Sequence, residues 1–187
     1  MHSDPPTTVL IVPGLRDHVP EHWQTHLQAT LPRARTVAPL EHDKLSCRAR
    51  IDALHHELAA IDGPVILVAH SAGVMIVVHW ALHHQRTIKG ALLAAPADLE
   101  LPLPQGYPRV DELQANGWLP IPRRPLPFPS IVAASRNDPL ARFDRVAAMA
   151  SDWNGTLLDL GNVGHLNPAS GFGPWAAAGD LIDQLDN

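Results

Sequence analysis

The chain has 187 residues, of which 45% are hydrophobic and 18% are charged. This composition excludes an intrinsically disordered protein and indicates one globular domain over 1–187, long enough to bury a core. The formal net charge of −5 argues against nucleic acid or an anionic membrane surface as the main partner. The first residues lack a signal-peptide pattern, no apolar run reaches membrane-spanning length, and Cys47 has no second cysteine to pair with. We therefore expect a cytoplasmic protein.

The first half of the chain alternates short apolar runs with helical patterns. Trp23, Leu27 and Leu31 recur at steps of four, as on one face of a helix. Proline can open or stop a helix and serine is a good N-cap, so these residues set the expected boundaries. The expected elements are a strand at 7–12, a helix between Pro20 and Pro32, a strand at 35–40, a helix that follows Ser46 and ends at Gly63, a buried strand at 64–69 and a buried helix reaching about 85.

The second half of the chain continues this alternation of apolar runs and helical patterns, with one interruption. Residues 96–127 are rich in proline and predict a long irregular connection or a partial cap over one end of the sheet. Around that interruption we expect strands at 88–95, 130–134 and 156–160, a helix at 139–150, a glycine-rich loop at 161–173, and a last helix that starts at Pro174 and turns Trp175, Ile182 and Leu185 inward.

Strands that alternate with helices predict an α/β fold. The expected architecture is a three-layer α/β/α sandwich, with a mostly parallel sheet of about six strands covered by helices on both faces. Parallel sheets bind their ligands at the carboxyl ends of the strands. Candidate catalytic residues should therefore come directly after strands.

The turn at Ala69–Gly73 joins a buried strand directly to a buried helix. Ser71 stands at its apex with small residues two positions before and after it, which is the pattern of a nucleophile elbow with Ala69 in place of the first glycine. The spacing has a steric cause, because the strand and the helix come close on either side of the apex. The alternative is an ordinary turn in which Ser71 only caps the helix.

Two further residues follow strands in the order expected of a serine–acid–histidine triad. Asp138 follows the strand at 130–134, and His165 follows the last strand. A serine hydroxyl needs an imidazole to take its proton, and the imidazole needs a carboxylate to orient it. Asp138 could instead be only an N-cap, and His165 could be a loop histidine among the twelve in the chain. Asp98 is the reserve candidate for the acid.

An acyl-transfer site also needs hydrogen-bond donors for the oxyanion of its tetrahedral intermediate. The backbone N–H of Ala72, at the start of a helix, is one candidate. The second donor should come from the loop after the first strand, and we expect it to be Leu15.

The many histidines raise the possibility of a metal site. His22 and His26 share a helical face, and His79 and His83 repeat that spacing. No H-E-x-x-H motif or cysteine pair accompanies them, so we expect solvated histidines and no metal. The chain also lacks G-x-G-x-x-G and P-loop motifs, so no nucleotide cofactor is expected.

At this level of detail the chain resembles the small serine hydrolases of the retinoblastoma-binding protein 9 and YdeN type. The resemblance covers essentially the whole chain. It rests on Val12-Pro13-Gly14, His22-Trp23-Gln24, His70-Ser71-Ala72-Gly73 with Trp80, Ser135-x-x-Asp138-Pro139, and Gly164-His165-x-Asn167-x-x-Ser170-Gly171-x-Gly173-x-Trp175. It implies a minimal α/β-hydrolase fold of strand order 2-1-3-4-5-6 without the large cap of lipases. It also implies the triad Ser71, Asp138 and His165.

One property linked to the name of that family does not follow from this sequence. Binding of retinoblastoma-type proteins is associated with an L-x-C-x-E motif. The corresponding stretch here runs from Leu45 through Cys47 to Ala49, with alanine in the place of the glutamate. We therefore do not expect a retinoblastoma-type partner.

The sequence thus predicts a serine hydrolase that cleaves a small ester or amide through an acyl-enzyme on Ser71. From their expected place near the strand ends, His18, Trp23 and Trp118 are candidates for the substrate pocket. Two alternatives stay open. One is a binding module on a hydrolase scaffold with a slow or vestigial triad, and the other is a thioesterase or acyltransferase with the same triad.

Overall fold

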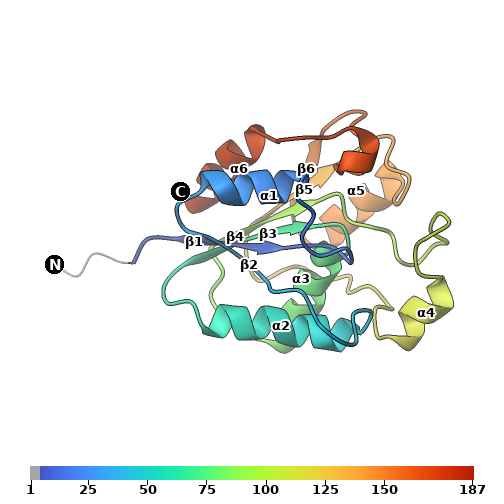
Figure 1. The fold of residues 1–187 in the computed structure, drawn as a ribbon, viewed down its shortest axis with the longest axis horizontal. Coiled ribbons are helices and arrows are strands. Elements are labelled where there is room, and N and C mark those ends of the chain that lie inside the picture. The colour runs from blue at the N-terminus through green and yellow to red at the C-terminus, as the bar shows by residue number, and fades with distance from the viewer. Residues whose placement is uncertain (1–4) are drawn as a thin grey trace.

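The computed structural model describes residues 5–187 and is built around a parallel β-sheet (Figure 1). Its order, β2-β1-β3-β4-β5-β6, confirms the predicted strand order, and each of the five pairings is parallel. The strands are β1 (Thr8–Val12), β2 (Ala34–Thr36), β3 (Val65–His70), β4 (Gly90–Ala94), β5 (Ser130–Ala134) and β6 (Thr156–Asp159). Residues 1–4, at the start of the segment without a signal-peptide pattern, lie outside the described residues.

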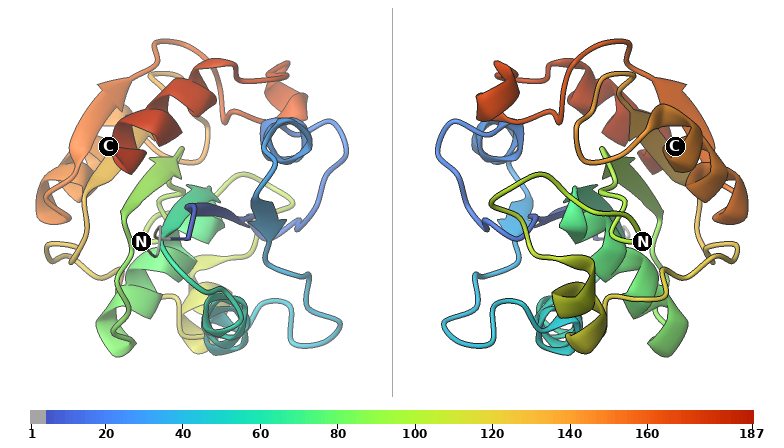
Figure 2. Two further views of the ribbon diagram at one scale, coloured as in Figure 1. Left: turned by 90° about the vertical axis from the view of Figure 1, so that its left-hand side faces the viewer. Right: turned by 90° about the vertical axis from the view of Figure 1, so that its right-hand side faces the viewer.

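Helices cover both faces of the sheet and give the predicted three layers (Figures 1 and 2). One face carries α1 and α6, and the other carries α2 and α3, with the buried residues of α5 in the same core. The helices are α1 (Trp23–Thr30), α2 (Cys47–Ala59), α3 (Ala72–His83), α4 (Val110–Ala115), α5 (Phe143–Asp152) and α6 (Ala177–Asp186), with a 3₁₀ turn at Pro168–Ser170.

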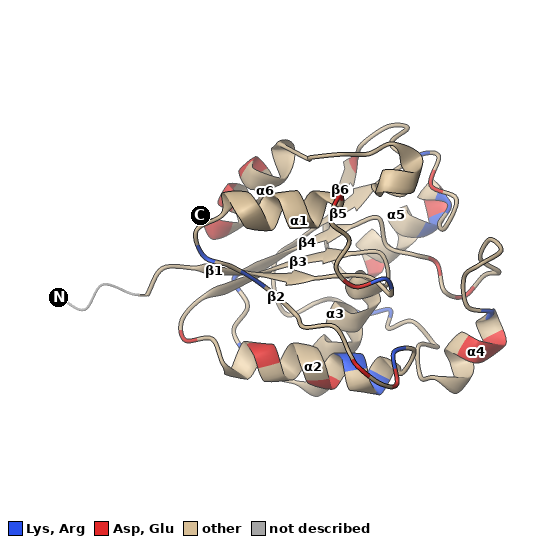
Figure 3. Cartoon of the chain, in the orientation of Figure 1, with Lys and Arg blue, Asp and Glu red and all other residues tan. Residues whose placement is uncertain are grey.

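The central strands are buried on both sides. Val65, Leu67 and Ala69 of β3 belong to the core under α2 and α3, while Ile66 and Val68 belong to the core under α1 and α6. A strand packed on two faces needs apolar residues at every position, which is why these strands read as continuous apolar runs. Figure 3 shows the charged residues on the outer helices and loops rather than on β1, β3, β4 or β5.

Some helix starts differ from the sequence prediction. α1 begins at Trp23 rather than at Pro20, because His22 is its N-cap and the Nδ1 atom of that ring accepts the Gln24 N–H at 3.2 Å. α5 begins at Phe143 rather than near 139. α6 likewise begins after the proline that was expected to open it.

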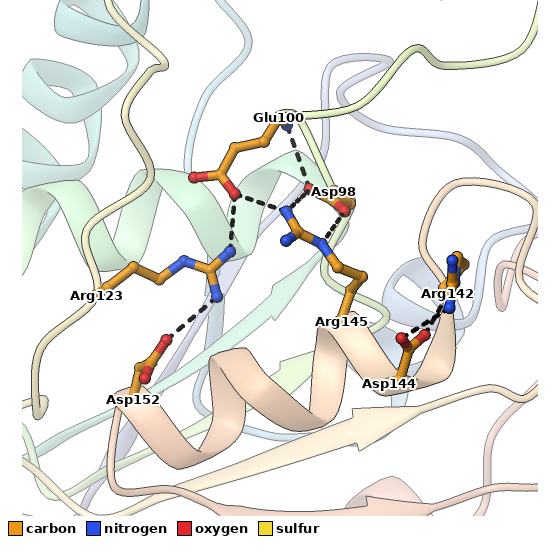
Figure 4. Close-up of polar contacts among 7 residues, drawn as sticks. All are labelled: Asp98, Glu100, Arg123, Arg142, Asp144, Arg145 and Asp152. Atoms are coloured by element: carbon orange, nitrogen blue, oxygen red, sulfur yellow. Dashed lines mark hydrogen bonds and ion pairs between the residues drawn. The ribbon is translucent and has the colours of Figure 1, made fainter.

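The segment 96–127 is irregular at both ends but contains α4, which the sequence pattern did not predict. Five charged residues, which we call the ion-pair network, tie it to α5 (Figure 4). Its contacts are Asp98–Arg145 at 2.7 Å, Arg145–Glu100 at 2.7 Å, Arg123–Glu100 at 2.9 Å and Arg123–Asp152 at 3.3 Å. Both ends of the segment are therefore fixed to one helix.

Within residues 5–187, no helix has both the length and the apolar character required to span a membrane.

Candidate active site

Ser71 lies at the sharp turn between β3 and α3. Its backbone has φ 58° and ψ −123°, a conformation that costs a non-glycine residue energy and that surrounding structure must enforce. The Ser71 N–H donates to the carbonyl of Ala94 on β4 at 3.0 Å, which fixes the turn to the sheet. A Cβ on Gly73 would lie 2.3 Å from the carbonyl oxygen of Val12, so only glycine fits there.

The structure brings Ser71, His165 and Asp138 into one hydrogen-bonded chain. Ser71 Oγ lies 2.8 Å from His165 Nε2, and His165 Nδ1 lies 2.8 Å from Asp138 Oδ2. The His165 and Asp138 side chains are almost fully buried. The carboxylate accepts the Nδ1 proton, which leaves the Nε2 lone pair free to accept the proton of the Ser71 hydroxyl. This is the arrangement that activates a serine nucleophile.

The alternative assignments of the acid do not agree with the structure. Asp98 is buried in the ion-pair network, where its carboxylate pairs with Arg145 rather than with His165. Asp138 does not cap α5, because that helix starts five residues later with Arg142 as its N-cap. The Asp138 Oδ1 atom instead accepts the N–H of Leu140 at 2.8 Å, which orients the carboxylate toward His165.

Two polar residues that precede Asp138 hold the loop of His165. Asn137 Oδ1 accepts the Gly164 N–H at 2.7 Å, and Ser135 Oγ accepts the Val163 N–H at 3.2 Å. Ser135 was predicted only as a motif position, and Asn137 was not singled out from the sequence. Small polar side chains at a strand end commonly bind the backbone of a neighbouring loop, and this could have identified them.

Two buried histidines stand beside His165. The His70 Nε2–H donates to the carbonyl oxygen of His165 at 2.8 Å, and the His22 and His70 rings lie 4.5 Å apart. Burial lowers the pKa of His70 well below its usual value, and the nearby His165 adds to this. Burial, with smaller effects of His165 and His26, lowers the pKa of His22 to about 4. Both rings are thus neutral at neutral pH.

The two predicted oxyanion donors come from the loop after β1 and from the start of α3. Leu15 and Ala72 both line the cavity at the serine, and Ala72 is the first residue of α3, whose N–H has no partner within the helix. A Cβ on Gly14 would lie 3.4 Å from Ser71 Cβ, which shows how closely the loop after β1 approaches the elbow.

Arg50 of α2 was not among the predicted site residues, and it fixes the loop after β1. Its guanidinium donates to Leu15 O at 3.3 Å and pairs with Asp17 at 3.0 Å, and its side chain is only 6% exposed. Arg50 shares the buried face of α2 with Cys47 and Leu54. An arginine at the spacing of a core face must be paired, and this signal could have identified it.

The cavity beside Ser71 has a volume of about 150 Å³. Its walls come from the loop after β1, the elbow, the start of the segment 96–127 and the turn after His165. Besides triad residues and oxyanion candidates, it is lined by Gly14, Arg16, Asp17, Val19, His22, Gln24, His70, Ala97, Leu99, Leu103, Tyr107, Leu140, Asn167, Pro168 and Ala169.

The three residues predicted for the substrate pocket lie outside this cavity, which corrects that prediction. Trp23 is fully buried under the site and packs edge-on against Trp175 at 5.0 Å. Trp118 is fully buried in the core beneath α4, where its indole N–H donates to the Leu45 carbonyl at 2.7 Å. His18 lines a separate small hollow against α1.

The histidine pairs do not form a metal cluster in the part of the chain that the structure describes. No group of three or more histidine, cysteine, aspartate or glutamate side chains in residues 5–187 is placed to hold a metal ion. His79, expected to be solvated, is buried and hydrogen-bonded through Nε2 to the Trp118 carbonyl at 3.0 Å.

Comparisons with known proteins agree with this fold. A YdeN-like hydrolase from Pectobacterium atrosepticum is 32% identical, with a TM-score of 0.81 over 96% of this chain and 90% of that chain. The ydeN gene product of B. subtilis is 18% identical, with a TM-score of 0.72 over 96% and 98%. Est1E from Butyrivibrio proteoclasticus, solved with ferulic acid, is 13% identical, with a TM-score of 0.70 over 98% and 91%.

A search of curated proteins returned no match. The family model described as serine hydrolase matches residues 9–184, almost the whole chain. Together with the similarity to the YdeN-like hydrolase, this match confirms the predicted resemblance. The chain therefore belongs to the serine hydrolase family and has the α/β-hydrolase fold.

Proposed function

We propose that the protein hydrolyses small carboxylic esters, with Ser71 as nucleophile, His165 as general base and acid, and Asp138 as the group that orients His165. The observation that carries the proposal is the continuous hydrogen-bonded chain Ser71–His165–Asp138, with contacts of 2.8 Å on both sides of the imidazole. The cavity of about 150 Å³ favours a short acyl group.

The proposed reaction has two halves. Ser71 Oγ attacks the ester carbonyl carbon while His165 Nε2 takes the hydroxyl proton, and the N–H groups of Leu15 and Ala72 stabilise the oxyanion. The bond to the leaving alcohol then breaks, and His165 gives its proton to that alcohol. Water next loses a proton to His165 and attacks the acyl-serine. The acid leaves, and the proton returns to Ser71.

Solved proteins that share the fold include an esterase and a thioesterase. Est1E was solved with ferulic acid, an esterase from Thermogutta terrifontis was solved with malate bound, and RedJ from Streptomyces coelicolor is a thioesterase. These proteins are 13–16% identical to this chain, so they support its fold but do not identify the bond that it cleaves. Small esters are the first substrates to test, with thioesters and aminoacyl amides as comparisons.

The test is labelling by a fluorophosphonate probe, which reacts only with an activated serine. We expect the wild type to be labelled and Ser71→Ala and His165→Ala to be unlabelled. Ser151→Ala, which removes an exposed serine of α5, is the matched control and should label fully. Absence of labelling in the folded wild type would contradict the proposal and favour a binding module on a hydrolase scaffold.

A further inference from the structure

The mouth of the cavity carries an arginine without an acidic partner. Arg16 is exposed, and its guanidinium lies over the ring of Tyr107, 5.4 Å from the centroid. Within residues 5–187, no carboxylate lies at ion-pair distance from it. The neighbouring Asp17 does line the cavity, but its carboxylate is paired with the buried Arg50. The Arg16 charge is therefore available to a ligand.

Arg16 is presented by a fixed turn. The residues on either side of it, Leu15 and Asp17, are both bound by Arg50, and the Asp17 N–H donates to Gly14 O at 3.1 Å. Tyr107 also lines the cavity and belongs to the segment 96–127, whose residues Asp98 and Glu100 the ion-pair network ties to α5. The guanidinium thus projects from a turn that Arg50 fixes and packs on the Tyr107 ring, so less side-chain freedom is lost when it binds a ligand.

The surroundings favour one kind of ligand group. The cavity that Arg16 and Ser71 both line has largely apolar walls, which include Leu99, Leu103 and Leu140. The charged or basic side chains that line the cavity with Arg16 are paired or neutral. Asp17 pairs with Arg50, and His165 is bound by Asp138. Buried His22 and His70 are uncharged at neutral pH. A guanidinium presents parallel N–H donors that match a carboxylate.

We propose that the substrate is an ester that carries a carboxylate, held by Arg16 at the cavity mouth while the ester carbonyl lies at Ser71. This inference rests on the proposed function and adds the substrate class to it. The carboxylate belongs either to the acyl side, as in a monoester of a short dicarboxylic acid, or to the leaving group.

The test compares matched ester pairs. On the acyl side, the 4-nitrophenyl monoesters of succinic, glutaric and adipic acid are compared with 4-nitrophenyl butyrate, valerate and hexanoate, after subtraction of spontaneous hydrolysis. On the leaving-group side, 4-acetoxybenzoate is compared with its methyl ester. We expect Arg16→Gln to lower kcat/KM about tenfold for the carboxylate esters of either the acyl-side or the leaving-group series, mainly through KM. The affected series identifies the side of the ester that carries the carboxylate. The neutral esters should change less than twofold.

Two further variants separate a specific contact from a general effect of charge. Arg33→Gln removes another exposed arginine, which lies between α1 and β2 and does not line the cavity, and it should change neither series. Arg16→Lys keeps the charge but loses the paired donors, so it should keep part of the carboxylate preference that Arg16→Gln loses. Equal losses on charged and neutral esters, or no loss on either, would overturn the inference while leaving the esterase proposal intact.

A binding measurement makes the outcome independent of turnover. In the Ser71→Ala background, isothermal titration with succinanilic acid and with butyranilide compares an anion with its neutral analogue. We expect succinanilic acid to bind more tightly and Arg16→Gln to remove that difference. If the esters are not hydrolysed but this preference is present, the proposed function fails and the carboxylate site stands. If Arg16→Gln leaves the binding ratio unchanged, the carboxylate site is refuted.

Discussion

At the residue scale, the proposed chemistry depends on the tautomer of one imidazole. Asp138 accepts the Nδ1–H of His165, so Nε2 carries the lone pair that faces Ser71. We expect Asp138→Asn to lower kcat by about 10⁴, because an amide can donate to Nδ1 and leave the proton on Nε2. Steady-state kinetics on a neutral 4-nitrophenyl ester measures this. A kcat within tenfold of the wild type would mean that another group orients His165.

The second residue-scale prediction concerns the elbow glycine. A Cβ at position 73 would lie 2.3 Å from Val12 O and 2.7 Å from Pro13 O, so β1 and α3 must separate in Gly73→Ala. We expect a loss of about 1–3 kcal/mol in the free energy of unfolding, measured in urea, together with loss of probe labelling. Gly179→Ala in α6 is the matched control, because an added Cβ there would meet no atom within 4 Å apart from its chain neighbours and the backbone of its own helix. It should be neutral or slightly stabilising.

The structure brings together those predicted residues whose position is set by the order of the strands alone. Ser71, Asp138 and His165 follow three parallel strands, and the carboxyl ends of such strands meet at one edge. The pocket residues were not predictable in this way. Trp23 and Trp118 are large aromatic residues in or near loops, and both are buried in the core. The free energy gained by burying an indole is larger than the cost of placing an irregular segment against the core.

At the element scale, the segment 96–127 forms one wall of the cavity, and its position depends on the ion-pair network. We expect Asp98→Asn to lower the free energy of unfolding by about 2 kcal/mol, because it breaks the ion pair between the buried Asp98 carboxylate and the partly exposed Arg145. KM for esters should rise as well, since Ala97 and Leu99 line the cavity beside Asp98. Urea denaturation and steady-state kinetics measure the two effects.

A double-mutant cycle tests whether this loss comes from the ion pair itself. Arg145→Met also breaks the pair, and the double variant Asp98→Asn, Arg145→Met should lose less than the sum of the single variants. Strictly additive losses would contradict the ion pair as the source, since asparagine can still accept the Glu100 N–H that Asp98 accepts.

The strands were easier to predict than the helix starts. Continuous apolar runs identify strands buried on both faces, as in β3 and β5. Helix α4 was missed because it is only six residues long and lies among prolines. The α5 start was misplaced because proline after aspartate resembles a capped helix. The Asp138 carboxylate instead binds His165 and accepts the nearby Leu140 N–H.

At the scale of the whole molecule, buried neutral histidines make stability depend on pH. The unfolded chain protonates His22 near its ordinary pKa of 6.5, whereas the folded state does so only at about 4. Between these values the unfolded state binds more protons, so the stability present above pH 6.5 is lost as the pH falls toward 4. His70 acts in the same direction. His22 alone should contribute a loss of roughly 2–3 kcal/mol.

The variant His22→Asn tests this dependence. Asparagine is a good N-cap, so it can keep the contact to the Gln24 N–H without a titrating group. Urea denaturation from pH 7 to pH 4.5 should show a smaller decline for the variant than for the wild type. Parallel declines would mean that His22 takes up its proton in the folded state as easily as in the unfolded chain.

The assembly of the site from three strand ends has a consequence during synthesis. Ser71 and His165 are 94 residues apart, and a ribosome adds about 5–20 residues per second. The nucleophile therefore leaves the ribosome roughly 5–20 seconds before its base, at that rate of elongation. In the proposed mechanism, the growing chain cannot form an acyl-serine during this interval. Hydrolysis begins only when β6 has joined the sheet and carried His165 to the elbow.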